Sequence, residues 1–151
     1  MPLTGTYERA IDQQLRVAIP KAMRQEFCRQ EGNDGLNRLF LTPGFDGVLN
    51  AYCPSVFETL GRVRTSAASG AAALRKFARL FYAQAYPAEW DGQGRIRIPE
   101  RLAAFADLRD AVVLVGVNDH IELWAPEKWH QFMRSEVEEF DRLGAEFFGE
   151  S

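Results

Sequence analysis

Two stretches of the chain, DQQLRVAIP at residues 12–20 and DGQGRIRIP at residues 91–99, have nearly the same sequence. Each begins with Asp, has Arg four residues later, continues through an alternating apolar run and ends in Pro. A repeated stretch of this kind in a chain of 151 residues predicts a fold in which one structural unit occurs twice. The two motifs therefore set the framework for the rest of the chain.

The correspondence continues on the C-terminal side of each motif. The Pro is followed by a helical segment at 21–27 and 100–105, and then by an apolar run at 39–41 and 112–115. Three further features then match in order: a turn, a second apolar run and a Pro-led segment with an aromatic residue. They lie at 45–47, 48–52 and 54–57 in the first copy and at 118–120, 121–124 and 126–129 in the second. The shared order supports a true repeat.

Each motif predicts a tight turn between two short strands. In the first copy we expect strands at 7–11 and 16–19, and in the second copy the glycines of 91–94 favour the same turn. Side chains alternate along a strand, so apolar residues point inward and the residues between them point outward. The inward set is Val17, Ile19, Ile96 and Ile98, and the outward set is Arg16, Ala18, Arg95 and Arg97.

Helices are expected after each motif and at the end of each copy. Pro20 and Pro99 suit the first position of a helix, where the missing N–H group is not needed. Longer helical patterns occur at 55–64, 71–85 and 127–143, and the small residues of 66–70 are typical of a loop; the helix at 71–85 has one apolar face and one basic face.

The chain divides into three parts on this interpretation: a first repeat at 1–65, a connecting loop and helix at 66–86, and a second repeat with a C-terminal helix at 87–151. One copy alone exposes too many strand edges and too little core to be stable. We therefore expect an α+β fold in which the hairpins of both copies interleave into one barrel-like body with pseudo-twofold symmetry and flanking helices. This arrangement would bring Arg16 and Arg95 near each other.

Composition narrows the classes of protein. The net charge is −3, but the charges are distributed unevenly. The part before Asp91 has 11 Lys and Arg against 8 Asp and Glu, whereas the part from Asp91 onward has 7 Lys and Arg against 13 Asp and Glu. An acidic protein with this distribution can still have a basic face. The sequence has no apolar run long enough for a bilayer and no signal-peptide pattern, which predicts a cytoplasmic protein. Cys28 and Cys53 form no disulfide framework, and neither His120 nor His130 has metal-ligand spacing, so we expect no metal, no cofactor and no enzyme.

The motif arginines are the strongest functional signal. A guanidinium group makes paired hydrogen bonds to phosphate or guanine, and a two-stranded ribbon fits the major groove of DNA. We expect Arg16 and Arg95 to contact DNA and the motif carboxylates, Asp12 and Asp91, to orient them. Arg97, Lys21 and Arg24 are predicted phosphate contacts. The alternatives are a structural salt bridge between Arg95 and Asp91, and a solvated helix face for Lys21 and Arg24.

The doubled Asp-x-x-Gly-Arg-x-x-x-Pro pattern, the helical Arg79-Leu80-Phe81 before the second copy, and the hairpin from Leu114 to Trp124 resemble the MraZ family over nearly the whole chain. The resemblance implies two swapped-hairpin repeats like those of AbrB and MazE, forming a double-split β-barrel, and ring-like homo-oligomers. It also implies a nucleoid-associated bacterial transcriptional regulator that binds direct repeats in double-stranded DNA upstream of its own operon, the division and cell-wall gene cluster. The family's DNA-contacting positions correspond to Arg16 and Arg95, and its other motif positions to Asp12, Asp91 and Gly94, beside the motif prolines.

Two positions depart from the family pattern. Leu15 stands where the pattern has Gly, and Thr4 stands where the family has an Arg. A Leu forced into the left-handed region costs about 1–2 kcal/mol, unless the first turn takes another shape. These departures leave a second interpretation open: an oligomeric protein-interaction module with weakened DNA binding.

Overall fold

The computed structural model describes residues 2–61 and 70–149. The first copy of the repeat contains β1 (Thr6–Ala10), β2 (Arg16–Ala18), α1 (Lys21–Glu31), β3 (Arg38–Pro43), β4 (Leu49–Tyr52) and α2 (Pro54–Leu60), and α3 (Ala71–Gln84) follows it. The second copy contains β5 (Tyr86–Glu89), β6 (Arg95–Arg97), α4 (Glu100–Phe105), β7 (Ala111–Val117), β8 (His120–Trp124) and α5 (Pro126–Glu136), followed by a 3₁₀ turn (Val137–Glu139) and α6 (Phe140–Phe147). The predicted α+β class is confirmed.

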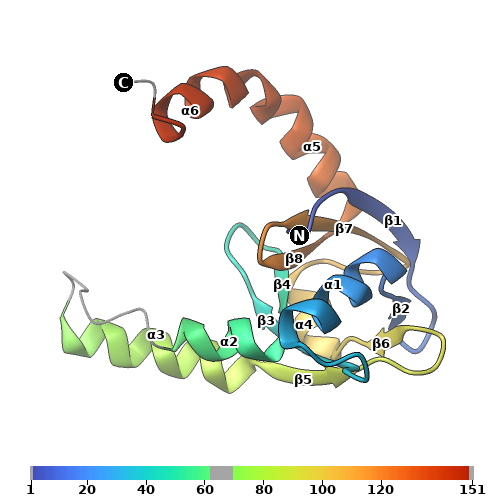
Figure 1. Ribbon diagram of the computed structural model, residues 1–151. Coiled ribbons are helices and arrows are strands. Elements are labelled where there is room, and N and C mark those ends of the chain that lie inside the picture. The colour runs from blue at the N-terminus through green and yellow to red at the C-terminus, as the bar shows by residue number, and fades with distance from the viewer. Residues whose placement is uncertain (1, 62–69, 150–151) are drawn as a thin grey trace.

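The strands of the two copies are exchanged. The larger sheet is antiparallel with the order β1-β7-β8-β4-β3-β5, so β1 of the first copy pairs with β7 of the second, and β5 pairs with β3. Counted inward from the two edges, the sheet has equivalent strands of the two copies: β1 and β5, then β7 and β3, then β8 and β4. The last two strands pair with each other at the centre. A smaller sheet pairs β2 with β6 (Figure 1). Each copy thus supplies an edge strand to the half of the sheet formed by the other copy. The closed double-split barrel and the division into 1–65, 66–86 and 87–151 stay predictions.

The core contains the residues that alternate inward along the two motifs. Val17, Ile19, Ile96 and Ile98 are each at most 1% exposed, as the alternation predicts. They join Phe27 and other apolar side chains from both copies in one large cluster. Burial of this much apolar surface is the main force that holds the copies together.

The motif prolines lie one residue earlier than expected. Pro20 and Pro99 have extended ψ values of 142° and 145°, so they precede the first turns of α1 and α4 rather than occupying the first helical position. The carbonyl of Pro20 accepts hydrogen bonds from the N–H groups of Met23 and Arg24, which begins α1. Each Pro therefore fixes the point at which the chain leaves its strand and enters its helix.

Two helices at the ends of the copies differ from their predicted bounds. The helix expected at 55–64 covers Pro54–Leu60, and residues 62–64 and most of the loop at 66–70 lie outside the described residues. The helix expected at 127–143 is wrong as a single element, because it divides at Val137–Glu139 into α5 and α6. A β-branched Val next to a run of carboxylates has weak helix propensity, and like charges in adjacent turns repel.

The flanking helices lie away from the β2–β6 ribbon. In Figure 1, α3 and α6 extend toward one side of the molecule, and the turns of β2 and β6 lie at the other. Within residues 2–61 and 70–149, every helix is too short or too polar to cross a bilayer.

Candidate nucleic-acid interface

The first motif forms a turn held together by one carboxylate. Oδ1 of Asp12 accepts hydrogen bonds from the backbone N–H groups of Gln14 and Arg16 at 2.9 and 2.8 Å. Its second oxygen, Oδ2, accepts a bond from Nε of Arg16 at 2.9 Å. A backbone bond from the N–H of Leu15 to the carbonyl of Asp12, 2.9 Å long, closes the turn. Asp12 thus orders both the turn backbone and the guanidinium.

The second motif repeats this arrangement bond for bond. Oδ1 of Asp91 accepts from the backbone N–H groups of Gln93 and Arg95 at 2.9 and 3.0 Å, and Oδ2 accepts from Nε of Arg95 at 3.2 Å. The N–H of Gly94 donates to the carbonyl of Asp91 at 2.9 Å. The expected orienting contact between carboxylate and guanidinium is therefore present in both copies.

The residue before each motif arginine has a left-handed backbone. Gly94 has a φ of 78°, and Leu15 has a φ of 62°. The departure from Gly in the first copy has thus not changed the shape of the turn, and Leu15 carries a conformational cost of about 1–2 kcal/mol. Its side chain is half-buried and packs against the core, which offsets part of that cost.

The same two positions join the copies to each other. The carbonyl of Leu15 accepts a hydrogen bond from the N–H of Ile98, and the carbonyl of Gly94 accepts one from the N–H of Ile19, each 2.8 Å long. Sequence reasoning missed these bonds, because they depend on which strand lies beside each turn. They fix the two turns relative to each other.

Three arginines share the outer face of the β2–β6 ribbon. Arg16 lies opposite Arg97, and Arg95 lies opposite Ala18, while Val17 and Ile96 between them face the core. Arg16 is thus directly across from Arg97 and diagonal to Arg95. Nε of Arg97 donates to the carbonyl of Gln14 at 3.3 Å, so this side chain lies over the turn of the other copy.

The motif side chains remain accessible and charged. The side chain of Arg16 is 37% exposed and that of Arg95 is 33% exposed. Backbone N–H donation from Arg16 and Arg95, aided by their side chains, holds the pKa of Asp12 and Asp91 below the usual range. Each carboxylate engages the Nε edge of its guanidinium, and the arginines still reach the surface.

Lys21 and Arg24 lie beside the ribbon at the start of α1. Lys21 is exposed, whereas Arg24 is half-buried and donates from Nε to the carbonyl of Ile19 at 2.9 Å. The guanidinium of Arg24 also covers Gly94, where an added Cβ would lie 2.7 Å from its central carbon. Arg24 therefore supports the second turn from α1, a contact that sequence spacing does not reveal.

The described residues contain no cluster of side chains suited to a metal ion. Across residues 2–61 and 70–149, no three His, Cys, Asp or Glu side chains come together in a group that could hold a metal ion. His120 pairs instead with Asp119 and Glu122, with 2.9 Å between Nδ1 and the Asp119 carboxylate. The arginine face is the strongest candidate site.

Known proteins resemble this chain over most of its length. The family model described as MraZ protein, antitoxin-like, matches residues 81–146, which cover the end of α3 and most of the second copy. A protein of Roseiflexus sp. (strain RS-1) named Transcriptional regulator MraZ is 37% identical over 130 residues, which is 85% of each chain. Proteins of the same name from Limosilactobacillus fermentum and Lactobacillus helveticus are 32% and 31% identical, covering 96% and 92% of each chain.

Proposed function

The chain belongs to the MraZ family of transcriptional regulators, and we propose that it binds double-stranded DNA through the arginine face of the β2–β6 ribbon. The observation that carries the proposal is the pair of matching turns, in which Asp12 and Asp91 hold the guanidinium groups of Arg16 and Arg95 at the surface. Family membership favours a regulator over an enzyme.

DNA recognition requires contacts to base edges, which read the sequence, and contacts to phosphates, which position the protein. The three arginines of the ribbon suit both kinds of contact. An oriented guanidinium bonds to two acceptors of a guanine edge, and its neighbours on the same face reach the phosphates on either side. Arg95 and Arg16 are assigned to the base edges, and Arg97 and Lys21 to the phosphates. Arg24 acts mainly by supporting the turn at Gly94.

The charge distribution is compatible with this role. The net charge of −3 opposes nonspecific attraction to DNA, so binding depends on a local basic face. In Figure 1 α6 extends away from the ribbon, so its carboxylates lie on a different side of the molecule from the arginine face.

One ribbon makes few contacts, so affinity requires several copies on one DNA. A homo-oligomeric ring would place ribbons along direct repeats, and linked binding events raise the affinity without new contacts. The target we propose is a set of direct repeats upstream of the chain's own operon, in the division and cell-wall gene cluster. The protein would act in the cytoplasm at the nucleoid and would need no cofactor.

Fluorescence anisotropy with a labelled duplex of these repeats tests the proposal. We expect Arg95→Ala to weaken binding strongly and the apparent affinity of the wild-type chain to fall steeply with salt, because bound phosphates release counterions. Arg109→Ala is the matched control, since it removes one exposed cation that lies outside the ribbon, outside α1 and outside the C-terminal helices. Equal affinity of Arg95→Ala and wild type would reject the ribbon as the DNA-binding face.

The alternative function is an oligomeric interaction module with weakened DNA binding. The observation in its favour is the number of large apolar side chains exposed on α3 and on α5–α6, which is typical of protein-binding surfaces. Light scattering with and without the duplex separates the two functions. A stable oligomer that ignores every duplex upstream of the operon would favour the alternative.

A further inference from the structure

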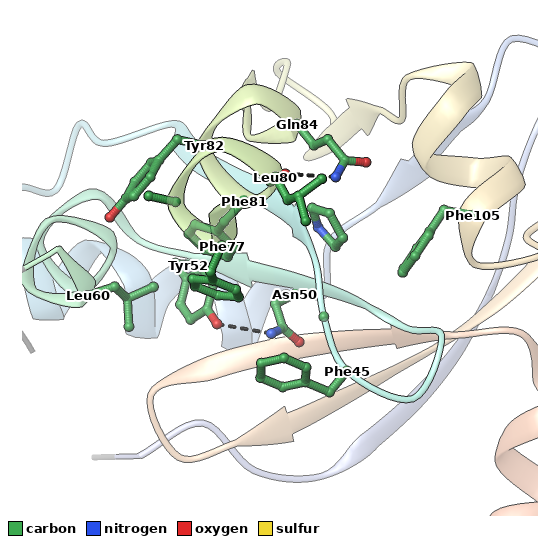
Figure 2. A pocket seen from close by; sticks show the side chains of 13 residues that line it. Phe45, Asn50, Tyr52, Leu60, Phe77, Leu80, Phe81, Tyr82, Gln84 and Phe105 are labelled. Atoms are coloured by element: carbon green, nitrogen blue, oxygen red, sulfur yellow. Dashed lines mark hydrogen bonds between the residues drawn. The ribbon is translucent and has the colours of Figure 1, made fainter. Parts of the chain in front are cut away.

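A pocket of about 480 Å³ lies between α3 and the β3–β4 hairpin. Its walls are apolar: Phe77, Leu80 and Tyr82 come from α3, and Phe45 comes from the hairpin turn (Figure 2). Asn50 and Tyr52 form its polar floor, joined by a hydrogen bond of 2.9 Å from Nδ2 of Asn50 to the Tyr52 hydroxyl. The pocket lies outside the arginine face and has no role in the proposed DNA contact.

The apolar side chains that form the walls of this pocket are unusually exposed to solvent. The side chain of Leu80 is 58% exposed, and Phe45, Phe77 and Tyr82 are all well exposed. No residue of α3 is fully buried, although one face of the helix is strongly apolar. Apolar patches of this kind mark binding surfaces for other protein segments.

The C-terminal arm, defined as residues 126–147, has a second unpartnered apolar surface. Val137, Phe140, Leu143 and Phe147 recur at helical spacing, and Phe140 and Phe147 are 72% and 76% exposed. The opposite side of α6 has ion pairs from Arg142 to Glu139 and Glu146. A helix of eight residues is too short to be stable in water by itself, so this one requires a partner for its apolar side.

The two surfaces have opposite charge. Helix α3 has Arg75, Lys76 and Arg79 exposed and no acidic residue. The arm from position 136 onward has one Arg against five carboxylates, those of Glu136, Glu138, Glu139, Asp141 and Glu146. An acidic helix with an apolar stripe complements a basic helix that borders an apolar pocket.

We infer that the pocket beside α3 receives the C-terminal arm of a second copy of this chain, with Phe140 and Phe147 entering between α3 and the β3–β4 hairpin. The arm does not cover the pocket of its own chain, because both surfaces are exposed in the described residues. A contact between two different surfaces can repeat head-to-tail, and repetition closes it into a ring when the rotation permits. The inference rests on the proposed homo-oligomer and identifies the surfaces that form it.

A mixing experiment tests this contact in the absence of DNA. The arm variant is Phe140→Asp with Phe147→Asp, the pocket variant is Leu80→Asp, and the control is Val117→Asp, which changes an exposed apolar residue outside both surfaces. Light scattering should find the wild type and the control as oligomers and each variant alone as a monomer of about 17.1 kDa. A 1:1 mixture of the two variants should form dimers and nothing larger, because it has one intact arm and one intact pocket per pair.

Two outcomes would overturn the inference. An oligomeric pocket variant would mean that the arm binds elsewhere, and a monomeric wild type would mean that the pocket serves a different partner. A photo-crosslinker in place of Phe140 provides a second measurement in a chain with both surfaces otherwise intact. Crosslinks should join Phe140 of one copy to α3 or the β3–β4 hairpin of another, and crosslinks confined to other segments would contradict the assignment.

This experiment separates the contact from the proposed DNA binding. If assembly survives both sets of substitutions while Arg95→Ala still weakens DNA binding, only the arm–pocket contact is wrong. If the mixture forms dimers while Arg95→Ala binds DNA like the wild type, only the DNA contact is wrong.

Discussion

The turns at 12–16 and 91–95 have the same hydrogen bonds but different residues at the left-handed position. Gly94 meets the backbone requirement without strain, and its bare Cα leaves room for the guanidinium of Arg24. Leu15 meets the same requirement at a cost and places its own side chain against the core. The carboxylate and the strand pairing therefore determine the shape of the turn, whereas the residue at this position determines what packs over it.

The repeat relates the two packing solutions. Arg24 stands four residues after Pro20, and the equivalent position in the second copy, four residues after Pro99, is Ala103. The small Gly94 of the second turn thus corresponds to the large Arg24 on α1. The large Leu15 of the first turn corresponds to the small Ala103 on α4. The contact of Arg24 with Gly94 and the correspondence of the repeat predict how the two turns respond to substitution.

The largest effect is expected when the second turn is given the residue of the first. Gly94→Leu adds the left-handed cost of about 1–2 kcal/mol and an overlap with Arg24 of about 1–3 kcal/mol, so the free energy of unfolding should fall by roughly 2–5 kcal/mol in urea denaturation. The double variant Gly94→Leu with Arg24→Ala imitates the first turn and should recover about half of the loss. Additive effects of the two substitutions would show that Arg24 and Gly94 are not coupled.

Arg95 and Arg16 test whether the two turns contribute equally to DNA binding. Each Arg→Ala substitution should weaken binding by about 1–3 kcal/mol if both guanidinium groups contact base edges. Because both turns have the same geometry, we expect effects of similar size in anisotropy titrations at fixed salt. A large effect of Arg95→Ala beside no effect of Arg16→Ala would confine the contact to the second copy and weaken the role of the shared geometry.

Acid provides a smaller test of the carboxylates. Asp12 and Asp91 have a folded-state pKa below the unfolded value of about 3.9, so their contribution to stability is complete above that pH and is lost as pH falls through the folded pKa. Replacing both with Asn should therefore flatten the loss of stability below about pH 4, measured as the urea midpoint against pH. If the urea midpoint of the Asn variant falls below about pH 4 as steeply as that of the wild type, other carboxylates dominate the loss of stability in acid.

The smallest effect is expected for Leu15→Gly. Relief of the left-handed strain, about 1–2 kcal/mol, is opposed by the greater chain entropy of Gly, about 0.5–1 kcal/mol, and by the loss of a half-buried side chain. The free energy of unfolding should therefore change by less than about 1 kcal/mol in either direction. A loss well above this value would assign Leu15 a larger share of the core than its exposure indicates.

Local pattern predicted the parts of the fold that depend on local chemistry. The alternation of Val17 and Ile19 with their neighbours identified the buried side of β2, and the spacing of Asp12 and Arg16 identified the turn and its internal contact. The conditional cost at Leu15 also followed from the sequence, since it depends only on backbone sterics.

The repeat predicted that the hairpins of the two copies interleave, but the individual contacts between the copies were beyond reach of local patterns. The bond between Leu15 and Ile98 and the contact of Arg24 with Gly94 depend on the exchange of strands between copies, which no single segment encodes. The break at Val137–Glu139 was missed because the apolar spacing continues through it, while the run of carboxylates disturbs the backbone without changing that spacing.

The exchange of β1 and β5 between the copies has a consequence for how the molecule can change over generations. A symmetric dimer of single units must alter both of its turns with every mutation, because one coding segment specifies them. Here the two partners are fused into one polypeptide, so each half can acquire its own substitutions while still relying on the other for its sheet. A leucine in one turn and a glycine in the other are what such independence permits, and under the proposed DNA contact two unlike turns would meet unlike halves of a site.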